Sequence, residues 1–360
     1  MKFGLMTQIQ IPRPWTETTE RCAYWNALEQ GVAGEAAGFE YFWITEQHFL
    51  AEIGHAPASD MFLAALSQRT RTLRHGLGVV LLPIHNPFYV AERVATLDVL
   101  SNGRVEFGTG RGTSSYILEG LGFDPSKGRE VGKEALEAVL KMYEEEFFKG
   151  YKGDHFDLPA RHVTPRPIQR PHPPLWVAAT NLGTYEYAGK QGFGVIGVTR
   201  NTVEETKAAV ASYRAAIRSA DRSSLIGKTA NENVAVFGIA CCDTDDRRGR
   251  DLACRAARWY YGDNDAELNH LRFTTAGGVE KVRERISKMS NDDLIANGMA
   301  IGGDADTVSR QVEKWASVGL DQMIFMLQAG NATHDQVMRS IELIGERVIP
   351  RFADAGRVAA

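Results

Sequence analysis

Short apolar runs alternate along the whole chain with longer segments that repeat apolar residues every three or four positions. The runs predict β-strands at residues 1–8, 39–44, 76–82, 104–108, 175–180, 194–198, 233–241 and 322–327. The segments between them predict amphipathic helices, as at Val90, Val94 and Leu97. The run at 76–82 is continuously apolar, which is typical of a parallel strand covered on both faces.

Eight strands that alternate with helices fit either an open doubly wound sheet or a closed (β/α)8 TIM barrel. An open dinucleotide-binding sheet would carry a G-x-G-x-x-G loop after its first strand. Here the first strand continues into residues 8–12, which contain no glycine. We therefore predict a TIM barrel that forms a single domain over residues 1–360, with a helical insertion between strands seven and eight.

Two segments stand out as candidate lids over a barrel mouth. Residues 150–172 form a proline-rich loop, and residues 243–297 form the charged, helical insertion. Long loops inside a compact domain are usually functional. We expect one or both to close the site.

Composition narrows the function classes. The chain has 360 residues with 41 Lys and Arg and 45 Asp and Glu, so its net charge of −4 gives no general attraction to nucleic acid. No run approaches the roughly 20 apolar residues that a membrane span needs, and the start is too polar for a secretory signal. The four cysteines are irregularly spaced, so we expect free, buried thiols in a cytoplasmic protein.

The predicted carboxyl ends of the strands are polar but poor in carboxylates. Glu46 and His48 are the residues there that suit a metal, and the motifs of metalloproteases, α/β-hydrolases and P-loop proteins do not occur in the sequence. The sequence therefore predicts no metal site and argues against hydrolytic chemistry.

Arg111 follows the fourth predicted strand within Gly108-Thr109-Gly110-Arg111-Gly112, where glycines allow a ligand to approach the backbone. Residues 180–184 join the fifth strand to a helix start, whose free amides suit an anion. Together they could hold one phosphate group. The alternative is that Arg111 pairs with a carboxylate and that Thr180 or Thr184 only caps the helix.

Two further features allow two interpretations each. His48 is either an acid/base group or a structural, hydrogen-bonded histidine, and loop histidines such as His85 have weaker claims. Glycines at 76 and 78 in the third strand indicate either a bulge or the close approach of a ligand.

Several motifs, in this order along the chain, resemble the bacterial luciferase-like flavin-dependent monooxygenases. They are residues 35–39, 43–49, 82–87, 95–98, 101–104, 107–112, 165–169, 173–179, 339–343 and 350–352. The resemblance covers nearly the whole chain except the insertion.

This resemblance implies a TIM barrel that binds reduced FMN supplied by a separate flavin reductase. Oxygen adds to the flavin, and the peroxide so formed oxidises a small organic substrate. The positions that match the family's phosphate site are Arg111, Thr180, Gly183 and Thr184. Those that match its flavin-ring site are Gly78, Val79 and Gly110, the ring lying inside the cylinder of strands. The family also implies a homodimer, in which helices 59–69 and 87–100 make the contact.

One position departs from the family. Where luciferases read Glu-His-His-Phe, this chain has Glu46, Gln47, His48 and Phe49, so Gln47 replaces the luciferase catalytic histidine. Glutamine forms hydrogen bonds but does not exchange a proton near neutral pH. His48 therefore either takes over the acid/base role or is structural, and light emission is not expected.

Three functions follow from these observations. The first is an FMN-dependent monooxygenase, and the second is a dehydrogenase that uses the deazaflavin F420 on the same barrel. F420 has an acidic tail, for which Arg111, Lys190 and Arg200 are the candidate basic residues. The third is a non-catalytic flavin-binding subunit.

Overall fold

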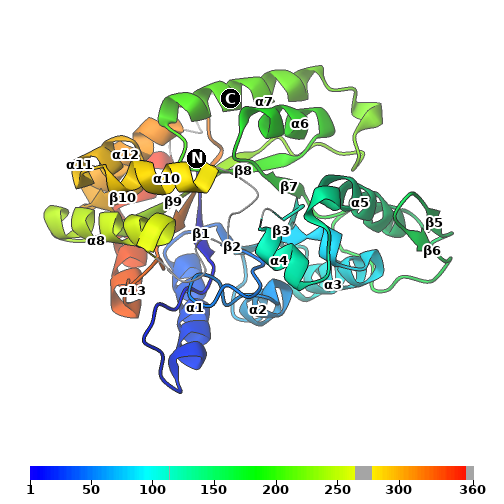
Figure 1. The fold of residues 1–360 in the computed structure, drawn as a ribbon, viewed down its shortest axis with the longest axis horizontal. Helices are drawn as coiled ribbons and strands as arrows, with labels where there is room; N and C mark the ends of the chain where they lie inside the picture. Colours follow the sequence, from blue (N-terminus) through cyan, green and yellow to red (C-terminus); the bar gives the residue numbers. More distant parts are fainter. Residues whose placement is uncertain (113, 264–277, 354–360) are drawn as a thin grey trace.

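Eight parallel strands close into a barrel surrounded by helices, as predicted (Figure 1). The structure is a computed structural model that describes residues 1–112, 114–263 and 278–353. Neighbouring strands follow the order β9-β11-β1-β2-β3-β4-β7-β8, and β8 pairs back to β9 to complete the cylinder.

The barrel strands are β1 (Lys2–Thr7), β2 (Tyr41–Ile44), β3 (Arg74–Leu81), β4 (Val105–Gly110), β7 (Leu175–Ala178), β8 (Gly194–Val198), β9 (Val234–Cys242) and β11 (Gln322–Met326). The larger helices are α1 (Thr19–Ala36), α2 (Ser59–Ser67), α3 (Pro87–Leu100), α5 (Gly128–Glu144), α6 (Leu182–Gln191), α7 (Val203–Ser219), α8 (Asp246–Arg258), α10 (Gly278–Ser287), α12 (Ala305–Ala316) and α13 (His334–Leu343). Shorter helices are α4 (Ser115–Gly120), α11 (Asn291–Ala296) and α14 (Pro350–Ala353).

A strand that the sequence pattern did not predict follows the insertion 243–297. β10 (Ala300–Gly303) pairs in parallel with residues 239–242 of β9, whereas residues 234–237 of β9 pair with β8. β9 therefore extends beyond the end of β8, and β10 pairs with the backbone groups of β9 that would otherwise have no partner there. Helices α8, α10 and α11 confirm the helical character of the insertion within the described residues.

Aromatic side chains fill the inside of the barrel. Trp43 and Trp176 are buried and meet edge to face, with 5.2 Å between ring centroids. Gly76 lies beside the Trp43 ring, where a Cβ atom would collide with the indole. The cylinder itself is thus occupied, which corrects the expectation that a flavin ring lies inside it: a ligand has to bind above the tryptophans, at the mouth.

Ionic contacts close the bottom of the barrel. Glu106 on β4 is buried, pairs with Arg74, and accepts a hydrogen bond from Trp176 Nε1 at 2.5 Å. Burial raises the pKa of the Glu106 carboxyl above its ordinary value, although the Arg74 guanidinium acts in the opposite direction. This end of the barrel is sealed.

The proline-rich loop lies at this bottom end. It follows α5 and leads into the first residue of β7, and Gln169 Nε2 donates to the carbonyl of Val105, where β4 begins. Its hairpin, β5 (Tyr151–Lys152) and β6 (Asp157–Leu158), extends past α5 at the edge of the molecule (Figure 1). The prediction that this loop is a lid is therefore wrong, because a loop that joins a helix to the next strand lies opposite the mouth.

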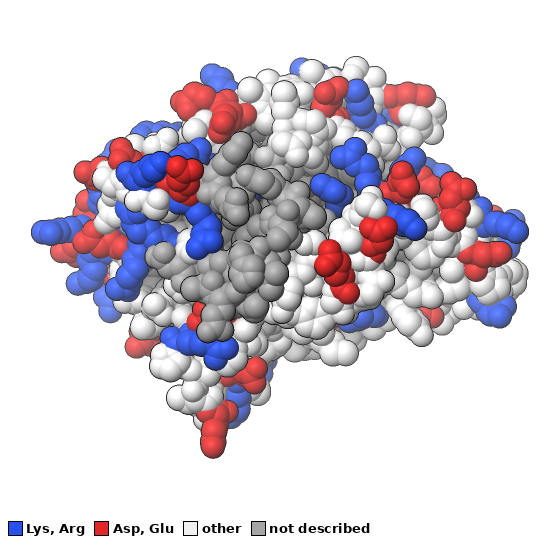
Figure 2. Space-filling view, viewed as in Figure 1, with Lys and Arg blue, Asp and Glu red and all other residues white. Residues whose placement is uncertain are grey.

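The surface and the thiols agree only in part with the sequence analysis. Lys, Arg, Asp and Glu are interspersed over the visible face (Figure 2). Cys241, Cys242 and Cys254 are buried as expected, but Cys22 on α1 is exposed, and all four are free. No helix in the described part of the chain is both long and apolar enough to cross a membrane.

His75 on β3 makes folding sensitive to acid. Burial and the nearby Arg104 guanidinium lower the pKa of His75 to about 3, and Arg104 Nη1 donates to its Nε2 at 2.9 Å. The unfolded chain binds a proton at this residue below pH 6.5, whereas the folded chain does not until about pH 3. Through this residue, the free energy of unfolding of the wild type should fall by up to about 1.4 kcal/mol per pH unit as the pH is lowered from 6.5 to about 3. We expect His75→Gln to remove this part of the pH dependence.

Urea unfolding at a series of pH values measures this slope for the wild type and the variant. The control is His162→Gln, since His162 is exposed and should leave the slope unchanged. Parallel wild-type and His75→Gln slopes would contradict the prediction, whatever the absolute stabilities.

Candidate active site

The polar groups at the mouth are organised around Glu46, which follows β2. Its Oε1 accepts hydrogen bonds from His48 Nε2 at 2.9 Å and from His85 Nε2 at 2.6 Å. Its Oε2 accepts the Leu81 amide at 2.9 Å, where β3 ends. One carboxylate thus joins the carboxyl ends of two neighbouring strands to two imidazoles.

The charge of Glu46 is set by these donors. Burial by itself would raise its pKa, but the hydrogen bonds from His48, His85 and the Leu81 amide outweigh burial and lower the pKa of Glu46 to about 2. Among the described residues, no group of three or more His, Cys, Asp and Glu side chains is placed to hold a metal ion. Glu46 is therefore an anion held by hydrogen-bond donors.

Gln47 and His48, the two candidate residues next to Glu46, have different surroundings in the structure. His48 joins the carboxylate, whereas the Gln47 side chain packs against Gly54, where a Cβ would lie 2.6 Å from Gln47 Cβ. Within the described residues, no hydrogen bond connects Gln47 to Glu46 or to either histidine. His85 is the partner that sequence reasoning undervalued, because its role depends on the turn η1 (Leu82–Ile84), which brings it to Glu46.

β3 carries the bulge that the glycines indicated. The pairing of β3 with β4 shifts between Leu77 and Val80, and the Gly78–Val79 peptide bond is cis. On β4, a Cβ atom at Gly108 would collide with the Leu77 carbonyl, and one at Gly110 with the Val79 side chain. The missing side chains of β4 therefore make room for the bulge, which places half-buried Val79 at the mouth.

Arg111 and the start of α6 leave the barrel side by side. β4 and β7 are neighbours, with Thr109 paired to Val177, so Arg111 and Thr180 follow adjacent strand ends. Arg111 is exposed, and no carboxylate of the described chain forms an ion pair with it. Within the described residues, the structure does not show the alternative in which Arg111 is tied to a neighbouring acid.

The first turn of α6 presents free amides. The helix begins at Leu182, and Asn181 caps it by accepting from the Thr184 amide at 3.1 Å and the Thr184 hydroxyl at 3.2 Å. The cap is thus Asn181, neither Thr180 nor Thr184. Gly183 is exposed, and the nearest atom to a Cβ placed on it would be Asn181 Oδ1 at 3.5 Å, so an anion can approach these amides.

These features fit a flavin with a phosphate tail. Arg111, Thr180, Gly183 and Thr184 lie where they could hold a phosphate, and Val79 beside Gly110 offers an apolar edge to a ring. The residues present are therefore compatible with FMN, although the Thr184 hydroxyl is directed to Asn181.

Other mouth residues were not predicted as a group. Gln10 and Gln328 exchange backbone and side-chain hydrogen bonds at 2.9 and 2.8 Å, and Gln8 Nε2 donates to the Tyr260 hydroxyl at 3.2 Å. Tyr260 belongs to the π-helix η4 (Trp259–Asp263), which follows α8. Nearby, Arg285 of α10 donates to the carbonyl of Arg200 at 2.6 Å. The insertion therefore contacts the ends of β1 and β8 at the mouth.

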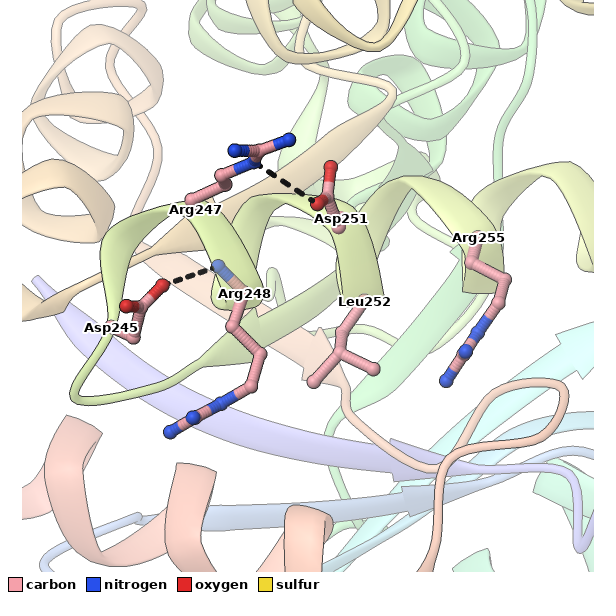
Figure 3. A pocket seen from close by; sticks show the side chains of 6 residues that line it. All are labelled: Asp245, Arg247, Arg248, Asp251, Leu252 and Arg255. Carbon is pink, nitrogen blue, oxygen red and sulfur yellow. Dashed lines mark hydrogen bonds and ion pairs between the residues drawn. The ribbon is translucent and has the colours of Figure 1, made fainter.

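A depression on the outer surface of α8 is a less suitable site (Figure 3). It is lined by residues of this one helix and its cap, and two of its three arginines form ion pairs, Arg247 with Asp251 and Arg248 with Asp243. It offers no concave surface built from several elements.

Comparison with known proteins identifies the family. Residues 1–322 match the family described as luciferase-like monooxygenase, and the chain belongs to this family. The structure of the monooxygenase RslO1 from Streptomyces bottropensis superimposes with a TM-score of 0.79 at 23% identity, covering 98% of this chain and all of that one. The TIM-barrel fold is thereby confirmed.

Relatives within the family differ in cofactor. Limonene 1,2-monooxygenase from Rhodococcus erythropolis is 28% identical over 97% of this chain and 87% of its own. The oxygenase component of flavin-dependent trigonelline monooxygenase from Acinetobacter baylyi is 27% identical over 54% of this chain and 53% of its own. F420-dependent glucose-6-phosphate dehydrogenase from Amycolatopsis mediterranei is 25% identical over 91% of this chain and 95% of its own. The chain is thus an oxidoreductase of a family that uses flavin or F420.

Proposed function

We propose that this protein is the oxygenase component of a two-component monooxygenase that uses reduced FMN and O2 to oxidise a small organic substrate. The observation that carries the proposal is the exposed Arg111, without an ion pair in the described chain, beside the open first turn of α6. A guanidinium and helix amides together suit a phosphate dianion. The names of the monooxygenase relatives, one of them an oxygenase component, support the same proposal.

Each part of the mouth has a task in this proposal. Bound FMN supplies the electrons that activate O2. Arg111, Thr180, Gly183 and Thr184 hold its phosphate, Gly78, Val79 and Gly110 contact its ring, and His48 exchanges protons. Gln47 contributes hydrogen bonds at the edge of the site. The insertion 243–297 excludes water as a lid, although its residues 264–277 lie outside the described part of the chain.

A dehydrogenase that uses F420 is the second candidate. Arg200 and the exposed Arg285 lie together at the mouth and add positive charge for an acidic cofactor tail. Lys190 is less suitable, since it pairs with Glu186 at 2.7 Å in the last turn of α6. Titrating the protein with FMN and with F420 compares the two cofactors directly.

We expect Arg111→Ala to weaken FMN binding by about 1.5–3 kcal/mol, the scale of hydrogen bonds to a charged group. Riboflavin, which lacks the phosphate, should bind the variant and the wild type equally. Isothermal titration with both flavins measures the difference. Lys190→Ala is the control, and equal losses for FMN and riboflavin would show that Arg111 does not contact the phosphate.

Turnover tests the oxygenase directly. The isolated chain, with reduced FMN supplied by an added flavin reductase, should convert a member of a panel of small organic compounds to a product that has gained one oxygen atom, detected by mass spectrometry. Hydrogen peroxide alone should not give this product. Release of H2O2 at the same rate with and without every compound would favour the non-catalytic subunit, a third candidate.

We also propose that α2 and α3 bind a second copy of the chain. Four large apolar side chains on these helices are exposed: Met61, Tyr89, Val99 and Leu100. We expect a dimer by light scattering, and a monomer for the double variant Met61→Glu, Tyr89→Glu, because two buried charges would oppose the contact. Phe147→Glu, at another exposed position, is the control. A monomeric wild type would contradict the proposal.

A further inference from the structure

The carboxylate of Glu46 fixes the hydrogen positions of two histidines. Both Nε2 atoms lie within hydrogen-bond distance of the same Oε1, at 2.9 Å for His48 and 2.6 Å for His85. An ionised carboxylate only accepts hydrogen bonds, so each Nε2 carries its hydrogen. In a neutral imidazole the lone pair is then on Nδ1. Among the described residues, neither Nδ1 has a hydrogen-bond partner.

The two histidines reach Glu46 from different sides. The His48 ring lies 6.0 Å from Phe49, whose ring meets Tyr116 of α4 at 6.4 Å, among the loops that follow the strands. His85 instead lines a cleft between α2 and α3, together with Asp60, Tyr89 and Arg93. His48 therefore lies among the loops of the mouth, whereas His85 reaches Glu46 from the neighbouring cleft, which Glu46 and Val80 also line.

The charged groups around the cluster are largely matched. In the cleft, Arg93 pairs with Asp60, its Nη2 lying 2.6 Å from Oδ1. Glu46 is 5% exposed, so water contributes little to the solvation of its charge. The two imidazoles and the Leu81 amide are thus its main donors, and they share one negative charge.

We propose that His85 is a positioning residue that lowers the proton affinity of His48 through the shared Glu46 carboxylate, and that His48 works as the acid/base group through Nδ1. The hydrogen bond from His85 uses part of the negative charge on Oε1. Without it, the whole charge would stabilise the protonated His48, which would then hold its proton more tightly.

One proton enters and leaves His48 in the acid/base step. Neutral His48 takes a proton at Nδ1 and becomes an imidazolium, while its Nε2 hydrogen stays on Glu46 and Glu46 remains ionised. The same Nδ1 returns the proton. The use of His48 as an acid/base group rests on the proposed function, whereas the effect of His85 on its proton affinity does not.

The experiment is a titration by NMR of the protein without flavin, labelled with ¹⁵N and ¹³C at histidine. The His48 signals are assigned by their loss in His48→Gln. We expect the Nε2–H form in the wild type, and a midpoint for His48 that is higher by about one pH unit in His85→Phe. His85→Gln, which keeps a neutral donor, should titrate close to the wild type.

Three results of this titration would contradict the proposed role of His85. An Nδ1–H form of neutral His48 in the wild type would overturn the proposal without any variant, even if His85→Phe failed to fold. An unchanged midpoint in folded His85→Phe, or equal shifts in His85→Phe and His85→Gln, would overturn it as well. Because no flavin is present, failure here is distinguishable from failure of the proposed oxygenase, which the FMN titrations and turnover test.

If turnover is found, its pH profile gives a second measurement. The part of the pH–rate profile that depends on protonation of His48 should have a higher midpoint pH in His85→Phe and an unchanged midpoint in His85→Gln. A structural role of His85 would reduce the rate at every pH without moving this midpoint.

Discussion

The mouth of this barrel depends on one buried anion. Glu46 follows β2, binds the amide that ends β3, and holds His48 and His85 on a single oxygen. Because a buried carboxylate is costly unless donors surround it, these contacts are coupled: moving one donor changes the charge that the others share. The loops after two strands are therefore fixed relative to each other by electrostatics as well as by the sheet.

A steric constraint acts beside it. The bulge in β3 places Val79 at the mouth only because Gly108 and Gly110 of the neighbouring β4 leave space for it. Arg111 directly follows the same strand, so one short segment both admits the apolar edge and positions the cation. Ring and phosphate sites proposed on this barrel are thus not independent features, since a change in β4 would alter both.

The sequence predicted the parts that depend on local pattern and on recognisable motifs. Alternating apolar runs were enough for the eight strands, and the paired glycines of β3 indicated a bulge as one of two alternatives. β10 was missed because its four residues are fixed by pairing with the overhang of β9, which no local pattern encodes. The loop 150–172 was misplaced because composition does not say at which barrel end a loop lies. The importance of His85 was missed because it meets Glu46 from 39 positions along the chain.

Two of the buried glutamates, Glu106 and Glu46, lie at opposite ends of the barrel and show why the chemistry belongs to one end. At the bottom of the barrel, burial raises the pKa of Glu106. Arg74 and Trp176 hold that carboxyl in place. At the mouth, two imidazoles and an amide overcome burial and keep Glu46 ionised. Two buried residues of the same type therefore have pKa values that are shifted in opposite directions. Glu46 fixes the protons of two neighbouring histidines, and it lies at the end where Arg111 and α6 leave room for a ligand.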